Sequence, residues 1–203
     1  MNKKPKWVIF DVGQVLYDYQ GFLSHAATHL NIESVLLKSE LDEIVEKSMK
    51  GEMTFEEVWE QVLKAHGKES ELEKILEIHW DSKKFVADTK HLIKQLHNKG
   101  YSIALFTNNW PNATERILKN VDEDLSVIKH MFESSVEKLK KPDMKFYELV
   151  EKRTGAKGNE IFFIDDKDVN LTTAEILGWQ TFLYKLGQDG GKTSNDKIRK
   201  QLL

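Results

Sequence analysis

The sequence predicts an α/β fold, with a doubly wound, mostly parallel sheet and an inserted helical cap. Short apolar runs at residues 7–10, 102–106, 161–164 and 181–184 are unbroken and rich in β-branched or aromatic residues. Such runs are typical of strands buried on both faces of a parallel sheet. Segments with helical spacing separate the last three runs, and strands that alternate with helices indicate a doubly wound sheet.

The core helices are predicted between and after these strands. Residues 87–100, 143–155 and 170–178 each carry apolar residues at helical spacing and each end at a glycine, which is a common helix stop. The last segment, 185–203, is predicted to form a glycine-containing loop followed by a short helix.

The interval between the first two strands does not follow this rhythm. It is helical throughout, and Thr54 with Glu57 has the spacing of a capping box at the start of one helix. We therefore predict a core domain made of residues 1–17 and 85–203, and a helical cap domain made of residues 18–84.

The composition restricts the class of protein. The chain has 203 residues, a formal net charge of -3 and no cysteine, which excludes disulfides and thiolate zinc sites. This charge predicts no binding to nucleic acid or to anionic membranes. The apolar run at residues 7–10 is too short for a secretory signal, and no stretch approaches the roughly 18 apolar residues of a membrane span. We expect a soluble cytoplasmic protein whose oligomeric state the sequence does not define.

Polar residues follow three of the predicted strands, where a parallel sheet places its ligand site. In chain order these residues are Asp11, then Thr107, Asn108 and Asn109, then Asp165 and Asp166. Three carboxylates in one crevice would repel one another, and a hard cation such as Mg²⁺ would relieve that repulsion. A lysine from the pair Lys140 and Lys141 would neutralise phosphate charge, so the set predicts phosphoryl chemistry.

Four short motifs resemble those of the haloacid dehalogenase superfamily. They occur in the family's order as FDVGQV (10–15), LFTNN (105–109), KKPD (140–143) and FFIDDKDVN (162–170). The resemblance covers essentially the whole chain. It implies a Rossmann-like core, and it implies that the helical insert is a cap of the C1 type.

The resemblance also implies a role for each matching residue. Asp11 would be the nucleophile that forms an aspartyl-phosphate. Thr107 and Lys141 would act with it, and both would bind the substrate together with Asn108. Asn170 would orient the loop of the fourth motif. The residues implied to hold Mg²⁺ are Asp11, Gly13 through its carbonyl oxygen, Asp165 and Asp166.

Position 13 departs from the family pattern. Phosphatases of this superfamily usually carry a second aspartate there, which protonates the leaving group and later activates water. Gly13 keeps the metal-binding carbonyl but cannot transfer a proton. Turnover is therefore slow, or the leaving group needs little help, or another group substitutes. A D-x-G-[NQ]-V motif resembles that of a subgroup of small sugar-phosphate phosphatases, which implies a hexose-1-phosphate type of substrate.

Three functions stay open at this point. The main prediction is a Mg²⁺-dependent phosphomonoester hydrolase acting on a small phosphorylated metabolite. A haloacid dehalogenase, whose aspartate attacks carbon, needs no acid at Gly13, but it has no use for two carboxylates at 165–166. A non-catalytic binding or regulatory protein on the same fold is the third, and Gly13 is its main support.

Overall fold

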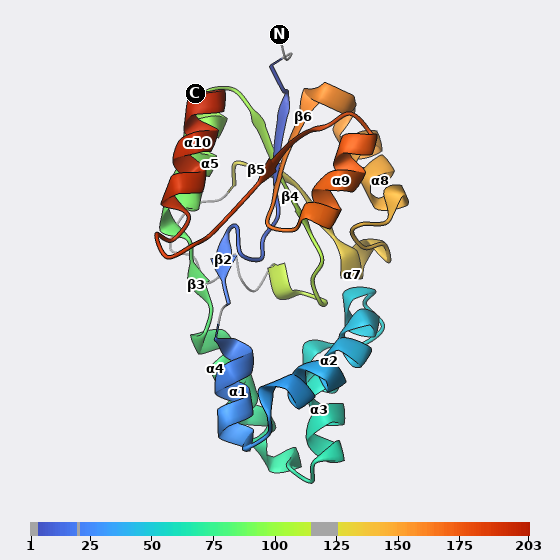
Figure 1. Ribbon diagram of the computed structural model, residues 1–203. Helices are drawn as coiled ribbons and strands as arrows, with labels where there is room; N and C mark the ends of the chain where they lie inside the picture. The colour runs from blue at the N-terminus through green and yellow to red at the C-terminus, as the bar shows by residue number, and fades with distance from the viewer. Residues whose placement is uncertain (1–3, 20, 115–125) are drawn as a thin grey trace.

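Parallel strands form the central sheet of the protein, and a group of helices lies beyond one end of it (Figure 1). The computed structural model describes residues 4–19, 21–114 and 126–203. Within those ranges the main sheet has five strands, and each neighbouring pair is parallel. In spatial order the strands are β5 (Ile128–Glu133), β4 (Ser102–Thr107), β1 (Trp7–Phe10), β6 (Ile161–Asp165) and β7 (Gln180–Leu183).

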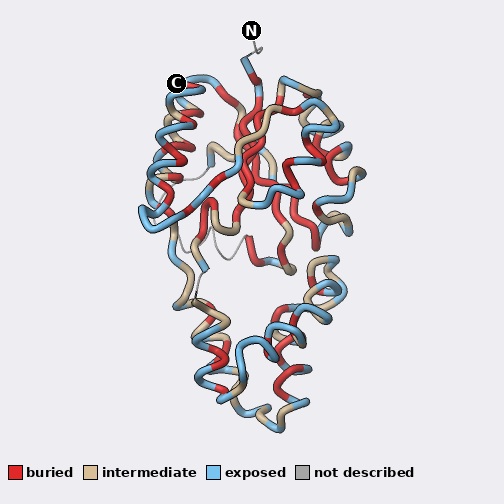
Figure 2. The backbone as a smooth tube through the Cα atoms, in the orientation of Figure 1, coloured by how far each residue is buried: buried red, intermediate tan, exposed pale blue. Residues whose placement is uncertain are grey.

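The structure confirms the four predicted strands and adds β5 at one edge. All four residues of β1 and all five of β6 are buried, which explains their unbroken apolar sequence (Figure 2). The first four residues of β5 alternate between half-buried and exposed. An edge strand of this kind has no continuous apolar run, and this is why the sequence analysis missed it.

Helices cover both faces of the sheet. Because successive side chains of a strand point to opposite faces, Val8 and Phe10 pack on one side while Trp7 and Ile9 pack on the other. The first side is covered by α5 and α10, and the second by α8 and α9. Their bounds are α5 (Ala87–Asn98), α8 (Met144–Thr154), α9 (Asp168–Ile176) and α10 (Lys192–Leu202), and a short α7 (Ser134–Glu137) and a 3-10 turn η2 (Gly158–Glu160) complete the core.

The helices of the insert form a second hydrophobic core of their own. They are α1 (Phe22–Leu30), α2 (Ser34–Met49), α3 (Phe55–Ala65) and α4 (Leu72–Asp81), with a 3-10 turn η1 (Glu69–Glu71) before α4. The predicted capping box opens α3: the Glu57 N–H donates to Thr54 Oγ1 at 3.1 Å, and the Thr54 N–H donates to Glu57 Oε2 at 2.7 Å. In the ranges that are described, no helix is both long and apolar enough to cross a membrane.

Two short antiparallel strands join the helical insert to the sheet. They are β2 (Tyr17–Asp18) and β3 (Lys84–Phe85), where the chain leaves the core and returns to it. We propose this pair as the boundary between core and cap, and residues 1–3, 20 and 115–125 of those domains lie outside the described residues. Across the junction, the Trp110 ring that follows β4 lies 4.5 Å from the Phe55 ring, so core and cap are in contact.

Candidate active site

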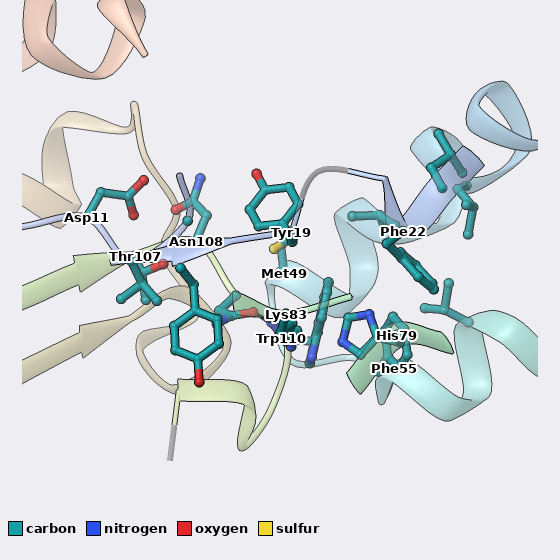
Figure 3. Close-up of a pocket in the computed structure, with 18 of the residues that line it drawn as sticks. Asp11, Tyr19, Phe22, Met49, Phe55, His79, Lys83, Thr107, Asn108 and Trp110 are labelled. Carbon is teal, nitrogen blue, oxygen red and sulfur yellow. Dashed lines mark hydrogen bonds between the residues drawn. The ribbon is translucent and has the colours of Figure 1, made fainter. Parts of the chain in front are cut away.

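The carboxyl ends of β1, β4 and β6 bring the predicted polar residues together. Phe10 is in register with Leu105 on one side and Ile164 on the other, so Asp11 emerges between two neighbouring strands. The Asp11 N–H donates to the Ile164 carbonyl at 2.8 Å. Asp11, Thr107 and Asn108 consequently lie at one end of the same cavity (Figure 3).

Lys141 is the lysine that enters this site. Its side chain is 1% exposed, and its Nζ lies 3.0 Å from Asp11 Oδ1 and 2.6 Å from Asp165 Oδ2. The same ammonium donates to the Phe106 carbonyl at 2.8 Å. Lys140 points elsewhere and forms an ion pair with Glu46 of α2. The choice of Lys141 over Lys140 in the third motif therefore agrees with the geometry.

Asn108 holds Lys141 in place through the backbone. Its Oδ1 accepts from the Lys141 N–H at 2.8 Å, and its Nδ2 donates to the Lys141 carbonyl at 2.9 Å. Both ends of the amide are thus occupied by the protein. The Asn108 side chain therefore fixes the loop that carries Lys141, and it also lines the cavity in which it is predicted to bind substrate.

The two aspartates of the fourth motif have different surroundings. Asp165 is fully buried, and its oxygens accept from Lys141 Nζ, from Asn170 Nδ2 at 3.0 Å and from the Lys167 N–H at 2.8 Å. Asp166 lines the cavity, and its Oδ1 is buried with no hydrogen-bond donor among the described residues. Ligand atoms of Asp11, Asp165 and Asp166 lie within 4.8 Å of one another, so the three could hold a metal ion.

The electrostatics of the site follow from this crowding. Burial, with the charges of Asp165 and Asp166, outweighs Lys141 and raises the pKa of Asp11 to about 6. Burial and the neighbouring Asp165 also raise the pKa of Asp166. Burial disfavours a charged Lys141, but the carboxylates of Asp11 and Asp165 outweigh it, so the pKa of this lysine is raised. The site therefore combines a fixed positive charge with carboxylates that a cation would stabilise in their ionised form.

Tyr19 is a residue of the site that the sequence analysis missed. A Cβ added at Gly13 would lie 2.9 Å from Tyr19 Cε1 and 3.4 Å from the Tyr19 hydroxyl oxygen. The ring therefore fills the space in which a side chain at position 13 would begin. Burial beside the carboxylates of Asp11, Asp166 and Asp165 raises the pKa of this phenol, which stays protonated. A tyrosine in a short connection carries no motif that would have indicated this place.

The cavity continues from these polar residues into the cap and has a volume of about 590 Å³. Trp110, directly after the second motif, is one of its walls (Figure 3). The cap contributes the aromatic rings of Phe22 and Phe55 and the side chain of Met49. Helical periodicity in a sequence does not distinguish a packed core from the lining of a cavity, so it gives no sign of these walls.

Comparison with known proteins identifies the family. A model of the haloacid dehalogenase-like hydrolase family matches residues 5–178. A sesquiterpene phosphatase of Aspergillus oryzae is 30% identical over 87 residues, which are 43% of this chain and 44% of that protein. The chain thus spans less than half the length of that curated relative.

Solved structures share the fold. A HAD-family enzyme of Bacteroides thetaiotaomicron, in complex with magnesium and inorganic phosphate, superposes with a TM-score of 0.76 at 23% identity, over 91% of this chain and 96% of that one. An L-2-haloacid dehalogenase of Xanthobacter autotrophicus, with chloropropionic acid covalently bound, gives 0.66 at 16% identity, over 98% and 84%. Since the family model covers most of the sequence and the motif residues meet in one site, the chain belongs to the haloacid dehalogenase-like hydrolases.

Proposed function

We propose that the protein is a Mg²⁺-dependent phosphomonoester hydrolase that acts on a small phosphorylated metabolite through an aspartyl-phosphate. The observation that carries this proposal is the contact between Asp11 and Lys141 at the polar end of the cavity, with Asp166 beside them. A buried ammonium beside the nucleophilic carboxylate, with a second carboxylate that could hold a cation, suits a dianionic phosphate better than a neutral carbon centre. The phosphatase relative and the magnesium–phosphate complex of the structural neighbour support the same choice.

The donor set fits a magnesium ion. We propose Asp11, Asp166 and the carbonyl oxygen of Gly13 as protein ligands, because Mg²⁺ takes few carboxylates and keeps several waters. The undonated Oδ1 of Asp166 is the structural reason, since a buried carboxylate oxygen needs a partner. Asp165, predicted as a further ligand, is bound by Lys141 and Asn170, and we propose that it positions both. When bound, the ion would neutralise charge on the phosphate and the carboxylates.

The residues of the chain then divide the chemistry between them. An Asp11 oxygen attacks phosphorus, and the bond from phosphorus to the alcohol oxygen breaks with its electron pair on that oxygen. The positive charge of Lys141 and the Thr107 hydroxyl, which both border the cavity, would stabilise the phosphoryl oxygens. The departing oxygen takes its proton from solvent, because Gly13 offers none. Water next attacks phosphorus of the aspartyl-phosphate, which releases inorganic phosphate and regenerates Asp11.

The sugar-phosphate subgroup indicated by the first motif stays a prediction. Its physical basis is the leaving group: an anomeric oxygen is less basic than an ordinary alkoxide, so it departs with less help from an acid. Gly13 is compatible with that substrate, and it is equally compatible with any other ester whose departure tolerates slow proton transfer.

Replacing the nucleophile tests the proposal. Wild-type protein with Mg²⁺ should release phosphate from p-nitrophenyl phosphate or from members of a phosphorylated-metabolite panel. Asp11→Asn should reduce that release by at least roughly 10³-fold, since the amide cannot form the intermediate. Asp81→Asn, which changes an exposed carboxylate at the end of α4, is the matched control and should behave as wild type.

Either of two results would contradict this proposal. Equal phosphate release by wild type and Asp11→Asn would exclude the nucleophilic role. Chloride release from 2-chloropropionate without Mg²⁺, in a preparation inactive on phosphates, would identify a dehalogenase instead.

A further inference from the structure

The cavity is much larger than a phosphate group needs. Its volume of about 590 Å³ equals roughly 20 water molecules at the density of the liquid. It lies within the range of pockets that enclose drug-sized organic ligands, roughly 300–1,000 Å³. The polar end at Asp11 and Lys141 takes up one side of it, so the remainder is available for the organic group of a substrate.

One face of α2 lines the part of the cavity that lies away from Asp11 and Lys141. Leu41, Val45 and Met49 of α2 follow each other at intervals of one turn and all border the cavity. Val45 and Met49 are only half-buried, although they lie on the inner side of the cap. Their apolar surface is therefore available to a ligand, and covering it would be favourable.

Another part of the cavity lining is mostly aromatic. Phe55, Val58 and Trp59 occupy one face of α3, and Trp110 of the core closes the wall toward the sheet. The Phe55 ring lies 4.0 Å from the His79 ring and 4.5 Å from that of Trp110. Such a stack presents apolar ring surface and is rigid because each ring is held by its neighbours.

Three charged side chains in the cap part of the cavity contact other protein groups, and they are Lys38, Asp42 and Lys83. Lys38 and Asp42, one turn apart on α2, pair with each other. The Lys83 ammonium lies 4.2 Å from the ring centre of Trp80 and 5.3 Å from that of Trp110. A sugar leaves several hydroxyls to be satisfied, and a site that recognises one places side-chain donors and acceptors to meet them. The described lining of the cavity supplies far more apolar surface than polar surface from hydrogen-bond donors and acceptors.

We infer that this cavity binds an apolar organic group, so that the substrate is the phosphate monoester of a hydrophobic alcohol. The phosphate lies against Asp11 and Lys141, and the hydrocarbon extends between α2 and α3 toward Phe55. This inference rests on the proposed function, and it replaces a sugar by a hydrocarbon as the part recognised by the cap.

A homologous series of substrates tests it. Phosphate release from n-alkyl monophosphates of four to ten carbons, kept below the concentrations at which they aggregate, is compared with release from glucose 1-phosphate. We expect kcat/KM to rise about fourfold per methylene until the cavity is filled. Octyl phosphate should exceed glucose 1-phosphate by at least roughly 100-fold.

Val45 offers a variant with a matched control on the same helix. Val45→Asn should flatten the dependence on chain length, and Val45→Phe should move the optimum to shorter chains by filling part of the cavity. Val35→Asn makes the same change at a residue of α2 that is 81% exposed, and it should keep the wild-type dependence. A dependence equally altered by Val35→Asn, or unaltered by both Val45 variants, would contradict the inference.

Binding of non-hydrolysable alkylphosphonates separates this inference from the proposed function. Octylphosphonate should bind more tightly than methylphosphonate to the Mg²⁺-loaded protein. If it does while no ester is hydrolysed, the proposed reaction is wrong and the apolar site stands. If esters are hydrolysed without dependence on chain length, or glucose 1-phosphate is preferred, the reaction stands and this inference is overturned.

Discussion

The ring of Tyr19 occupies the space beside Gly13 that the side chain of an acid at this position would need. The φ angle of Gly13 lies outside the left-handed region, so the backbone accepts any L residue there. The nearest atoms that a new side chain would meet belong to the Tyr19 ring, so this ring would have to shift. The site is therefore one substitution away from the acid that related phosphatases use.

We predict that Gly13→Asp raises kcat by roughly 10²-fold for an alkyl phosphate, because the new carboxyl can protonate the departing oxygen and then activate water. The gain should be smaller for p-nitrophenyl phosphate, whose leaving group needs little protonation. Steady-state phosphate release with both substrates measures the difference. Gly13→Asn adds the same bulk without an acid and should give no gain. Equal rates for the two variants would show that an acid at this position cannot act.

Asp11 makes the stability of the metal-free protein depend on pH. Its pKa is raised to about 6 from 3.8, so the folded state holds the proton more tightly than the unfolded state. The resulting stabilisation is fully present below pH 3.8 and is lost as the pH rises through 6, by about 3 kcal/mol in total. Asp11→Asn mimics the protonated acid, so this variant should keep the stabilisation at every pH.

Urea unfolding with chelator at pH 4 to 8 measures this effect. The free energy of unfolding of Asp11→Asn should exceed that of wild type by an amount that grows between about pH 4 and pH 6 and is then constant. Added Mg²⁺ should reduce this difference by stabilising the ionised wild type. Parallel curves for the two proteins would mean that Asp11 is not perturbed in this way.

At the level of single elements, the α3 helix combines a structural and a functional task. Its capping box fixes where it begins, and the next residues of the helix, Phe55 and Val58, border the cavity. We predict that Thr54→Ala lowers the free energy of unfolding by about 1 kcal/mol, because it removes the acceptor for the Glu57 N–H. Urea unfolding monitored by circular dichroism measures the change.

Glu33 provides the control for that substitution. It precedes α2 but makes no side-chain capping bond, so Glu33→Ala should change the stability by less than about 0.5 kcal/mol. If both alanine variants lose the same stability, the hydrogen bonds of the capping box contribute nothing specific.

Elements buried on both sides were predictable from sequence. The strands at 7–10 and 161–164 have no solvent-facing side, so each forms an unbroken apolar run that can be recognised in the sequence. The edge strand β5 has partly exposed residues such as Lys129, and its pattern is not distinctive. Helices were recognised by periodicity and their ends by glycine, as at Gly155, whose φ of 67° is the left-handed conformation.

At the scale of the whole molecule, the polar end of the site was predictable and the rest of the cavity was not. Asp11 and Asp166 directly follow strands and Thr107 is the last residue of one, and a parallel sheet brings strand ends together by its topology alone. The apolar walls depend on how the cap sits against the core. Val45 lies on α2 and Trp110 follows β4, and no spacing in the sequence relates them.

The contacts between the domains fix that arrangement. Lys140 of the core pairs with Glu46 of α2, the Lys138 ammonium donates to the Gly51 carbonyl at 3.1 Å, and Trp110 packs on Phe55. These contacts bring α2 and α3 over the strand ends. Under the proposed function, the reacting phosphate and the organic group attached to it would be held by two different parts of the fold.

The phosphorylated enzyme itself is the most direct object to measure. The protein is mixed with a phosphate ester and Mg²⁺, quenched rapidly in acid during turnover, digested and examined by mass spectrometry. One phosphoryl group should appear on the peptide that contains Asp11. It should accumulate because Gly13 leaves the second step without a base, whose help is worth roughly 10²–10⁴ in rate. The Asp11→Asn protein should carry none. Continued turnover with no phosphoryl group on Asp11, or with the group on another residue, would contradict an aspartyl-phosphate at this site.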